Sequence, residues 1–350
     1  MAQTTPGNPT ARPACIGGLY EICVGVPDLA ESIAYYERFG CRAGRFGTLD
    51  AAAARALYGV DSALRSVRLY HQNADHGLVR LMQWERPVNE GLGLDDNLRC
   101  VGSRWGVRLT ASVLDVANHA VTARDRGLPV RVIEPILAVI GEVTGERAPR
   151  PFADPLVGVR EMVVIQPLYR QVFFERFGYE SPHYGCICAQ SMFRTSQHTH
   201  AGMMIANDDH QVLRFYDEVL GLQRWFDGER PYAQATGSRQ IFGLEPDETH
   251  WMVDFDDPRS GHSLDARRSG KLKVVRFAAT SRLADKLDRA RPGCLGLSLY
   301  TWRTNDLEGL WKLVQASGAT QVTDVLADEF GMRAFSFIAP DGYSWTLLQD

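Results

Sequence analysis

The sequence has no long hydrophobic run, no excess of positive charge and no regular spacing of cysteines. No stretch approaches the ~18–20 consecutive apolar residues that a transmembrane helix needs, and the beginning of the chain lacks the basic and apolar segments of a signal peptide. We therefore expect a cytoplasmic protein that does not enter a membrane. The formal net charge is -4 and the Lys and Arg residues are scattered, which argues against a nucleic-acid partner.

Several signatures of enzyme chemistry are also missing. The sequence contains no glycine-rich phosphate loop, no nucleophile elbow and no His-Glu-x-x-His, so neither a nucleotide cofactor nor serine hydrolysis is indicated. The cysteine count of 7 is odd, so we expect free thiols rather than a disulfide framework or a zinc knuckle. What remains is an ordinary globular composition, with 45% hydrophobic and 23% charged residues.

The strongest positive signal is an internal repeat. It accords with the length of 350 residues, which exceeds the ~250 residues at which a single core usually stops growing and so predicts two domains. In each half, an alternating strand is followed by a break containing Asp and by a helix with an aromatic pair that ends at glycine. The matching features are the strands 21–26 and 200–205, the pairs Tyr35-Tyr36 and Phe215-Tyr216, and the glycines Gly40 and Gly221.

Each half contains a second strand-helix unit and a closing strand. The second strands are 107–111 and 297–300, their helices begin after Asp115 and Asp306, and these helices end at Gly127 and Gly318. The closing strands are 161–165, which follows Phe152-Ala153-Asp154-Pro155, and 345–348, which follows Ala339-Pro340-Asp341-Gly342. Pro-Asp-Gly favours a turn because Pro presets φ and Gly accepts a positive φ.

These features resemble the vicinal oxygen chelate superfamily, which includes glyoxalase I, extradiol dioxygenases and bleomycin resistance proteins. The resemblance rests on Val26-Pro27-Asp28-Leu29, the two aromatic pairs with their glycines, and the closing Pro340-Asp341-Gly342 turn. It implies an α+β fold of two tandem domains, each made of paired βαβββ units curled into a cup-shaped barrel. We expect a disordered N-terminus at 1–15, a first domain at 16–170, a linker at 171–195 and a second domain at 196–350.

Strand alternation predicts which side chains face the cups, because successive residues of a strand point to opposite faces. The apolar residues expected to pack outward are Ile22, Val24 and Val26 in the first strand and Ala201, Met203 and Ile205 in its counterpart. The residues expected to face the cups are Glu21, His200 and Met204. His198 shares the sequence parity of His200 and is expected on the same face.

In the superfamily, these inner positions hold metal ligands: His, Gln or Glu on the first strand, a second His, and a Glu on the closing strand. Carried over residue by residue, the first domain offers Glu21, Arg108 and Glu161. A guanidinium stays protonated and cannot bind a metal. We therefore expect Glu21 and Glu161 to act as catalytic residues in proton transfer and Arg108 to bind the substrate. Alternatively, the three form a buried ion-pair network that only holds the barrel together.

The second domain offers His200 as its catalytic candidate. The candidate substrate-binding residues of this domain are Met204, Ser298, Tyr300 and Thr346. Thr346 stands where the superfamily usually has Glu, so neither domain has a complete set of metal ligands, and no cofactor is firmly predicted. A divalent metal remains an alternative, and its atypical ligands would be His200, His250 and Asp254.

The resemblance suggests a glyoxalase-like protein, a lyase or isomerase that acts by proton transfer on a small carbonyl or aromatic compound. Fold alone does not fix function, so two alternatives stay open. One is a metal-free protein that binds and sequesters a small molecule, as the resistance proteins do. The other is a metal-dependent enzyme with atypical ligands. The expected partner is a small organic molecule, and a homodimer is one possible assembly.

Overall fold

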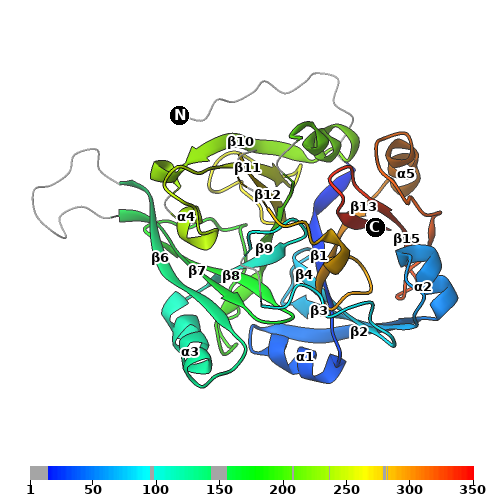
Figure 1. Cartoon of the computed structure of the whole chain (residues 1–350), viewed down its shortest axis with the longest axis horizontal. Coiled ribbons are helices and arrows are strands. Elements are labelled where there is room, and N and C mark those ends of the chain that lie inside the picture. Colours follow the sequence, from blue (N-terminus) through cyan, green and yellow to red (C-terminus); the bar gives the residue numbers. More distant parts are fainter. Residues whose placement is uncertain are drawn as a thin grey trace, which may run out of the picture.

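The chain folds into four strand-helix units, and their strands form two curled β-sheets that lie side by side (Figure 1). The structure is a computed structural model that describes residues 15–94, 98–142, 156–206, 209–235, 237–278, 281 and 283–350. The turn at Phe152-Ala153-Asp154-Pro155 and the expected break at Asn207-Asp208 lie outside the described residues. The four repeated units predicted from the sequence are otherwise present in the described part of the chain.

Each unit has a strand, a helical segment and three further strands, and the first and third units add a short helix after their second strand. The first unit contains β1 (Ile16–Gly25), α1 (Leu29–Glu37), β2 (Cys41–Leu49), α2 (Ala51–Tyr58), β3 (Leu64–His71) and β4 (Leu78–Trp84). The second contains β5 (Arg104–Thr110), α3 (Val113–Asp125), β6 (Arg131–Glu142), β7 (Leu156–Ile165) and β8 (Arg170–Phe177). The third contains β9 (Thr195–Met204), η1 (Gln211–Leu213), η2 (Phe215–Val219), β10 (Gln223–Pro231), η3 (Tyr232–Gln234), α4 (Ser238–Ile241), β11 (Thr249–Asp256) and β12 (Lys271–Phe277). After η4 (Leu287–Arg289), the fourth contains β13 (Gly296–Thr304), α5 (Leu307–Gln315), β14 (Leu326–Ala327), β15 (Arg333–Ile338) and β16 (Ser344–Gln349).

Short polar side chains mark where the longer helices begin. Asp28, Ser112 and Asp306 precede α1, α3 and α5, and each side chain accepts a hydrogen bond from the backbone N–H three residues later. The third unit differs from the expected helix, because a 3-10 turn (η1) and a π-helical turn (η2) replace it. Within the described residues, no helix has both the length and the apolar character required to cross a membrane.

The units pair differently from our expectation that each half of the chain would curl its own sheet. The first sheet has the order β14-β15-β16-β13-β1-β4-β3-β2 and joins the first and fourth units. The second sheet has the order β10-β11-β12-β9-β5-β8-β7-β6 and joins the second and third units. The four units have similar sequence patterns, so these patterns specify the unit but not its partner. The concave sides of the two sheets are called the first cup and the second cup below.

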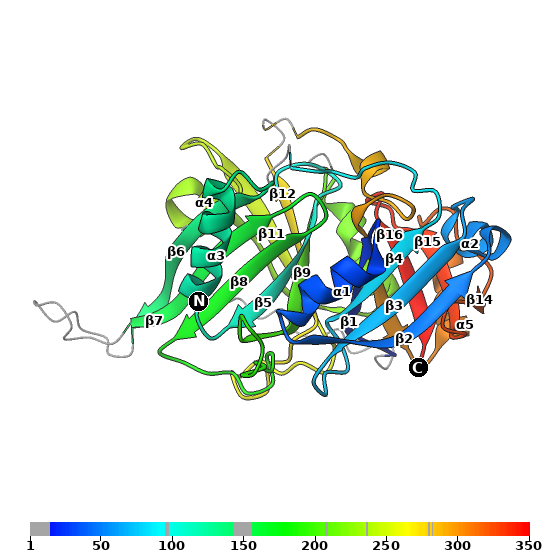
Figure 2. The same cartoon turned by 90° about the horizontal axis from the view of Figure 1, so that it is seen from below.

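The outer faces of the two sheets share one hydrophobic core. Ile22 of β1, Met203 of β9 and Trp302 of β13 belong to the same buried cluster, which confirms the outward packing predicted for the first strands. Tyr300 of β13 crosses this junction, because its hydroxyl donates to the backbone oxygen of Gly202 at 2.8 Å. Figure 2 shows the two sheets curling away from this junction. The shared core fixes the sheets together and leaves their inner faces available for sites.

Candidate functional site

The inner face of the second cup brings together ionisable side chains from the second and third units. His200 of β9 stands opposite Lys271 of β12 in the strand register. Glu161 of β7 pairs with Phe174 of β8, and the Phe174 ring lies 5.5 Å from the ring of His200. Glu161 and His200 were assigned to different cups from the sequence, and the pairing of the inner units places them in one.

A cavity of about 230 Å³ opens on this inner face. Its wall contains four cationic side chains, Arg176, Arg267, Lys271 and Lys273, together with Val159, Phe174, Tyr179, Ser181, Tyr184, His200 and Leu264. No carboxylate lies among these lining residues. Sequence reasoning missed all four cations. The alternation Lys271-Leu272-Lys273 on a strand was the signal, because it places both ammonium groups on one face.

Glu161 is a buried carboxyl without a hydrogen-bond or ion-pair partner among the described residues. Burial raises the pKa of Glu161 to about 7, and the nearby charge of Lys273 offsets this only in part. Gly237 makes room for the carboxyl, since a Cβ at that position would lie 1.8 Å from Glu161 Oε1. Val159, on the same face of β7, lines the cavity, so Glu161 lies one pleat further along the strand. A carboxyl that titrates near neutral pH can accept and return a proton.

Two imidazoles on the same inner face stay uncharged at neutral pH. Burial and the charges of Lys273 and Lys271 hold the pKa of His200 well below its usual value. Burial lowers the pKa of His250 to about 4. The Tyr184 hydroxyl lies 3.2 Å from His200 Nδ1 and fixes the orientation of that ring. His200 therefore offers a neutral hydrogen-bonding group to a ligand rather than a positive charge.

The carboxylates of β11 are engaged by the lysines of β12. Lys271 Nζ lies 3.0 Å from Asp254 Oδ2 and 3.3 Å from Asp256 Oδ1, and Lys273 Nζ lies 3.8 Å from Asp254 Oδ1. Burial alone would raise the pKa of Asp254, but the charges of Lys271 and Lys273 lower it to about 2. Asp254 is thus ionised, and its negative charge is matched mainly by Lys271.

The first cup is occupied by a buried ion-pair network. Glu21 of β1 has no exposed surface, and its carboxylate lies 2.6 Å from Arg80 Nη2 and 2.5 Å from Arg68 Nε. Burial raises the pKa of Glu21, but the charges of Arg80 and Arg68 more than offset this and lower it to about 2. The Thr301 hydroxyl also donates to Glu21, at 2.8 Å. A carboxylate held in this way is a weak base. Its contacts favour a stabilising role for Glu21 over the proton transfer that we expected from the sequence.

Residues of the turn between β14 and β15 also contact the two arginines of this network. Glu329 Oε1 lies 3.2 Å from Arg80 Nη1, and Tyr58 donates to Glu329 Oε2 at 2.8 Å. The Phe330 ring covers the Arg68 guanidinium at 4.4 Å. Thr346 also belongs to this sheet, where its hydroxyl pairs with Ser336 at 2.7 Å. The side chains of the chain itself therefore fill the part of the first cup around Glu21. A cavity of about 450 Å³ lies beside this network, and its wall includes Tyr58, Leu299 and Ser336.

Arg108 does not face either cup, which corrects the expected set of Glu21, Arg108 and Glu161. Its guanidinium donates to Ser196 O at 2.9 Å, contacts His198 Nε2 at 2.9 Å and lies over the ring of Tyr36 on α1. The register of β5 with β9 shifts between Val107 and Arg108, which places His198 and His200 on opposite faces. Strict alternation of side chains fails at this bulge. Because β5 is buried on both faces, the sequence pattern could not show that Arg108 and His198 point away from the cup.

The remaining predicted substrate-binding residues lie elsewhere. Tyr300 faces the junction between the sheets rather than a cup, and Ser298 is fully buried on β13 of the first sheet. Met204 packs in the apolar floor of the second cup in one cluster with Trp105 and Val275. Met204 is therefore the one of these residues that lies on the same inner face as Glu161 and His200.

The residues of the cups do not fit a metal ion. In the part of the chain that the structure describes, no group of three His, Cys, Asp or Glu side chains converges as a metal site requires. The suggested ligands His200, His250 and Asp254 share the inner face, but Lys271 and Lys273 already pair with Asp254 and their charge repels a cation. We therefore derive no step through a metal.

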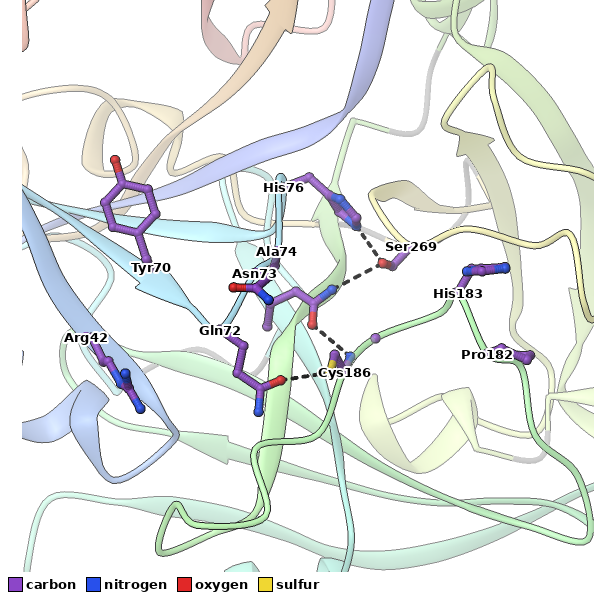
Figure 3. Close-up of a pocket in the computed structure, with 12 residues that line it drawn as sticks. Arg42, Tyr70, Gln72, Asn73, Ala74, His76, Pro182, His183, Cys186 and Ser269 are labelled. Atoms are coloured by element: carbon purple, nitrogen blue, oxygen red, sulfur yellow. Dashed lines mark hydrogen bonds between the residues drawn. The ribbon is translucent and has the colours of Figure 1, made fainter.

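Another cavity lies outside the cups, where the β3–β4 turn meets the segment before β9 (Figure 3). Its volume is about 570 Å³. At its edge Asp75 Oδ1 lies 2.5 Å from His76 Nδ1, and Ser269 Oγ lies 2.5 Å from His76 Nε2. The Asp75–His76–Ser269 hydrogen bonds have the order of an acyl-transfer triad. However, Ser269 has no exposed surface that a substrate carbonyl could reach. We interpret it as a link between the two sheets.

Replacing Ser269 with Ala is expected to reduce the free energy of unfolding by about 1–3 kcal/mol, because it leaves a buried ring nitrogen of His76 without its partner. Urea denaturation followed by fluorescence measures the change. The matched control is Cys186→Ala, which removes an exposed thiol from the same cavity and should change stability by no more than about 0.5 kcal/mol. Equal stability of the two variants would contradict the linking role.

Comparisons with known proteins identify the fold. No protein-family model matches the sequence, and the search of curated proteins gives no match. The structure is similar to glyoxalase I from Zea mays, with a TM-score of 0.52 and 14% sequence identity, covering 95% of this chain and 92% of that one. It is also similar to a putative dioxygenase from Bacillus subtilis, with a TM-score of 0.52 and 13% identity, covering 96% of this chain and 86% of that one. These likenesses confirm the fold expected from the repeats and carry no statement about the reaction.

Proposed function

We propose that this chain, which has the fold of the vicinal oxygen chelate superfamily, is a glyoxalase-like enzyme that moves a proton beside a carbonyl group of a small molecule in the second cup. The observation that carries the proposal is the position of Glu161: a buried carboxyl on the inner face, one pleat from the cavity and without a partner among the described residues. Its raised pKa, about 7, supports a role as proton acceptor.

The neighbouring groups supply what proton abstraction from carbon requires. When Glu161 takes a proton from the carbon next to a carbonyl, negative charge develops on the carbonyl oxygen. Lys273 acts electrostatically on Glu161, and Lys271 and neutral His200 line the same cavity as Lys273. These side chains stabilise the developing charge. Return of the proton to another carbon gives isomerisation, and loss of a leaving group gives elimination, so the proposal covers an isomerase or a lyase.

The test is hydrogen exchange in D₂O. We expect the protein to catalyse exchange of the hydrogens beside the carbonyl in at least one member of a panel of small oxo acids and aldehydes, as followed by proton NMR. The rate should fall about tenfold for each pH unit below about 7, because the acceptor must be ionised. Binding of panel members without exchange at any pH would favour the alternative of a sequestering protein.

A further inference from the structure

The charge of the second cup identifies a class of ligand. Of the four cations in the cavity wall, Lys271 is matched by Asp254 and Asp256, and Lys273 lies near Asp254. Arg176 and Arg267 have no carboxylate partner among the described residues. The four positive side chains of the wall outnumber the nearby carboxylates of Asp254, Asp256 and Glu161, so an excess of positive charge remains at this cavity.

Both unpaired guanidiniums are held in place by aromatic rings rather than by acids. Arg176 lies 4.8 Å from the centre of the Tyr184 ring and 5.3 Å from that of Tyr179. Arg267 lies 5.0 Å from the centre of the Trp225 ring, and its Nε is buried without a hydrogen-bond partner. A buried donor without a partner is costly, because it has lost its hydrogen bond to water. An anionic oxygen in the cavity would restore that bond.

We infer that the second cup takes a small anion, a compound whose carboxylate or phosphate group is bound by Arg176 and Arg267. Planar guanidiniums suit both groups because they donate two parallel hydrogen bonds. The apolar part of the wall, Phe174, Val159 and Leu264, contacts the body of the ligand. A volume of about 230 Å³ holds about eight water molecules, which suits a small oxo acid or a phosphorylated carbonyl compound.

This ligand class belongs to the proposed active site. Binding of the anion does not depend on the proposed proton transfer, but its conversion does. Binding is therefore tested separately from turnover, by isothermal titration calorimetry with three probes. Inorganic phosphate and pyruvate are the two anions, and pyruvamide is the uncharged counterpart of pyruvate. We expect at least one anion to bind at least tenfold more tightly than pyruvamide at low ionic strength, and its affinity to fall when NaCl is added. The tighter anion tells which group the site prefers.

The variant that tests the location is Arg176→Gln combined with Arg267→Gln. It should weaken anion binding at least tenfold and leave pyruvamide binding unchanged. Arg42→Gln is the control, because Arg42 lines the cavity outside the cups and its replacement removes one guanidinium there. If the double variant does not fold, Arg176→Gln alone serves, and Arg176→Lys should restore part of the affinity.

The outcomes separate the two proposals. Anion binding that is lost in Arg42→Gln but kept in the double variant overturns the inference, as does equal binding of pyruvate and pyruvamide or no binding of either anion. Anion binding without hydrogen exchange overturns the proton-transfer proposal alone.

Discussion

Replacing Arg80 with Met is expected to lower the free energy of unfolding by about 3–5 kcal/mol, because it leaves buried carboxylates without their counter-charge. Arg80 contacts Glu21 at 2.6 Å, Glu329 at 3.2 Å and Asp328 at 3.4 Å, and its side chain and all three carboxylates are fully buried. Arg68 still pairs with Glu21 in the variant, but the carboxylates of Asp328 and Glu329 lose their guanidinium. Guanidinium chloride denaturation at neutral pH measures the change.

The control for this prediction is an exposed ion pair. Arg214 and Glu218 form a pair with side-chain exposures of 61% and 56%, so Arg214→Met should cost no more than about 0.5 kcal/mol. The pH dependence gives a second check. Glu21 has a lowered pKa of about 2, so its stabilising contribution is present above its ordinary value of 4.5 and is lost as the pH falls towards 2. If Arg80→Met is no less stable than Arg214→Met, the network is not structural.

Replacing Glu161 with Gln is expected to reduce catalysed hydrogen exchange by about 10²–10⁴-fold, the usual contribution of a general base. Gln has nearly the same shape but cannot accept a proton, so the cavity and its cations should remain as they are. NMR-monitored exchange in D₂O measures the rate for a compound that the unmodified protein turns over. The matched control is Glu229→Gln on β10, which makes the same chemical change at an exposed position of the same sheet.

Stability gives an independent measure of the same residue. Between about pH 4.5 and pH 7 the folded protein keeps the Glu161 proton that the unfolded chain has released, because burial raises the pKa to about 7. The unmodified protein therefore loses stability as the pH rises through this window, whereas the Gln variant does not. The difference between the two should reach about 3 kcal/mol at pH 8, since one pKa unit corresponds to about 1.4 kcal/mol. A constant difference from pH 5 to pH 8 would show that the carboxyl is solvated.

The fold could be predicted from particular local signals. The apolar alternation of β1 and β9, the capping residues Asp28 and Asp306, and the glycine that follows α1 each act within a few residues of the chain. Such signals specify strands and helices because they depend on backbone geometry and on one buried face. The repetition of these signals then identified four units of one kind.

The candidate site could be predicted only in part. Glu161, His200 and Met204 were named from the sequence and share the second cup. Glu21 faces the first cup as expected, but its ion pairs are with Arg68 and Arg80 and not with Arg108, as the alternative had supposed. Arg108 and Tyr300 were placed on the wrong side, because a bulge in β9 and burial on both faces hide the orientation of a strand residue. Arg176 and Arg267 were missed, since no local pattern distinguishes a cavity-lining arginine from a surface one.

The sequence by itself determined the repeated unit, because a unit is built from contacts between residues that are close along the chain. Only the tertiary structure decided which unit pairs with which, and therefore which charges share a cup. That choice depends on side-chain packing and ion pairs between strands far apart in sequence, such as β1 with β13 and β5 with β9. The same long-range pairing surrounds Glu21 with ion pairs in the first cup and brings a cavity, two unpaired guanidiniums and a buried carboxyl together in the second.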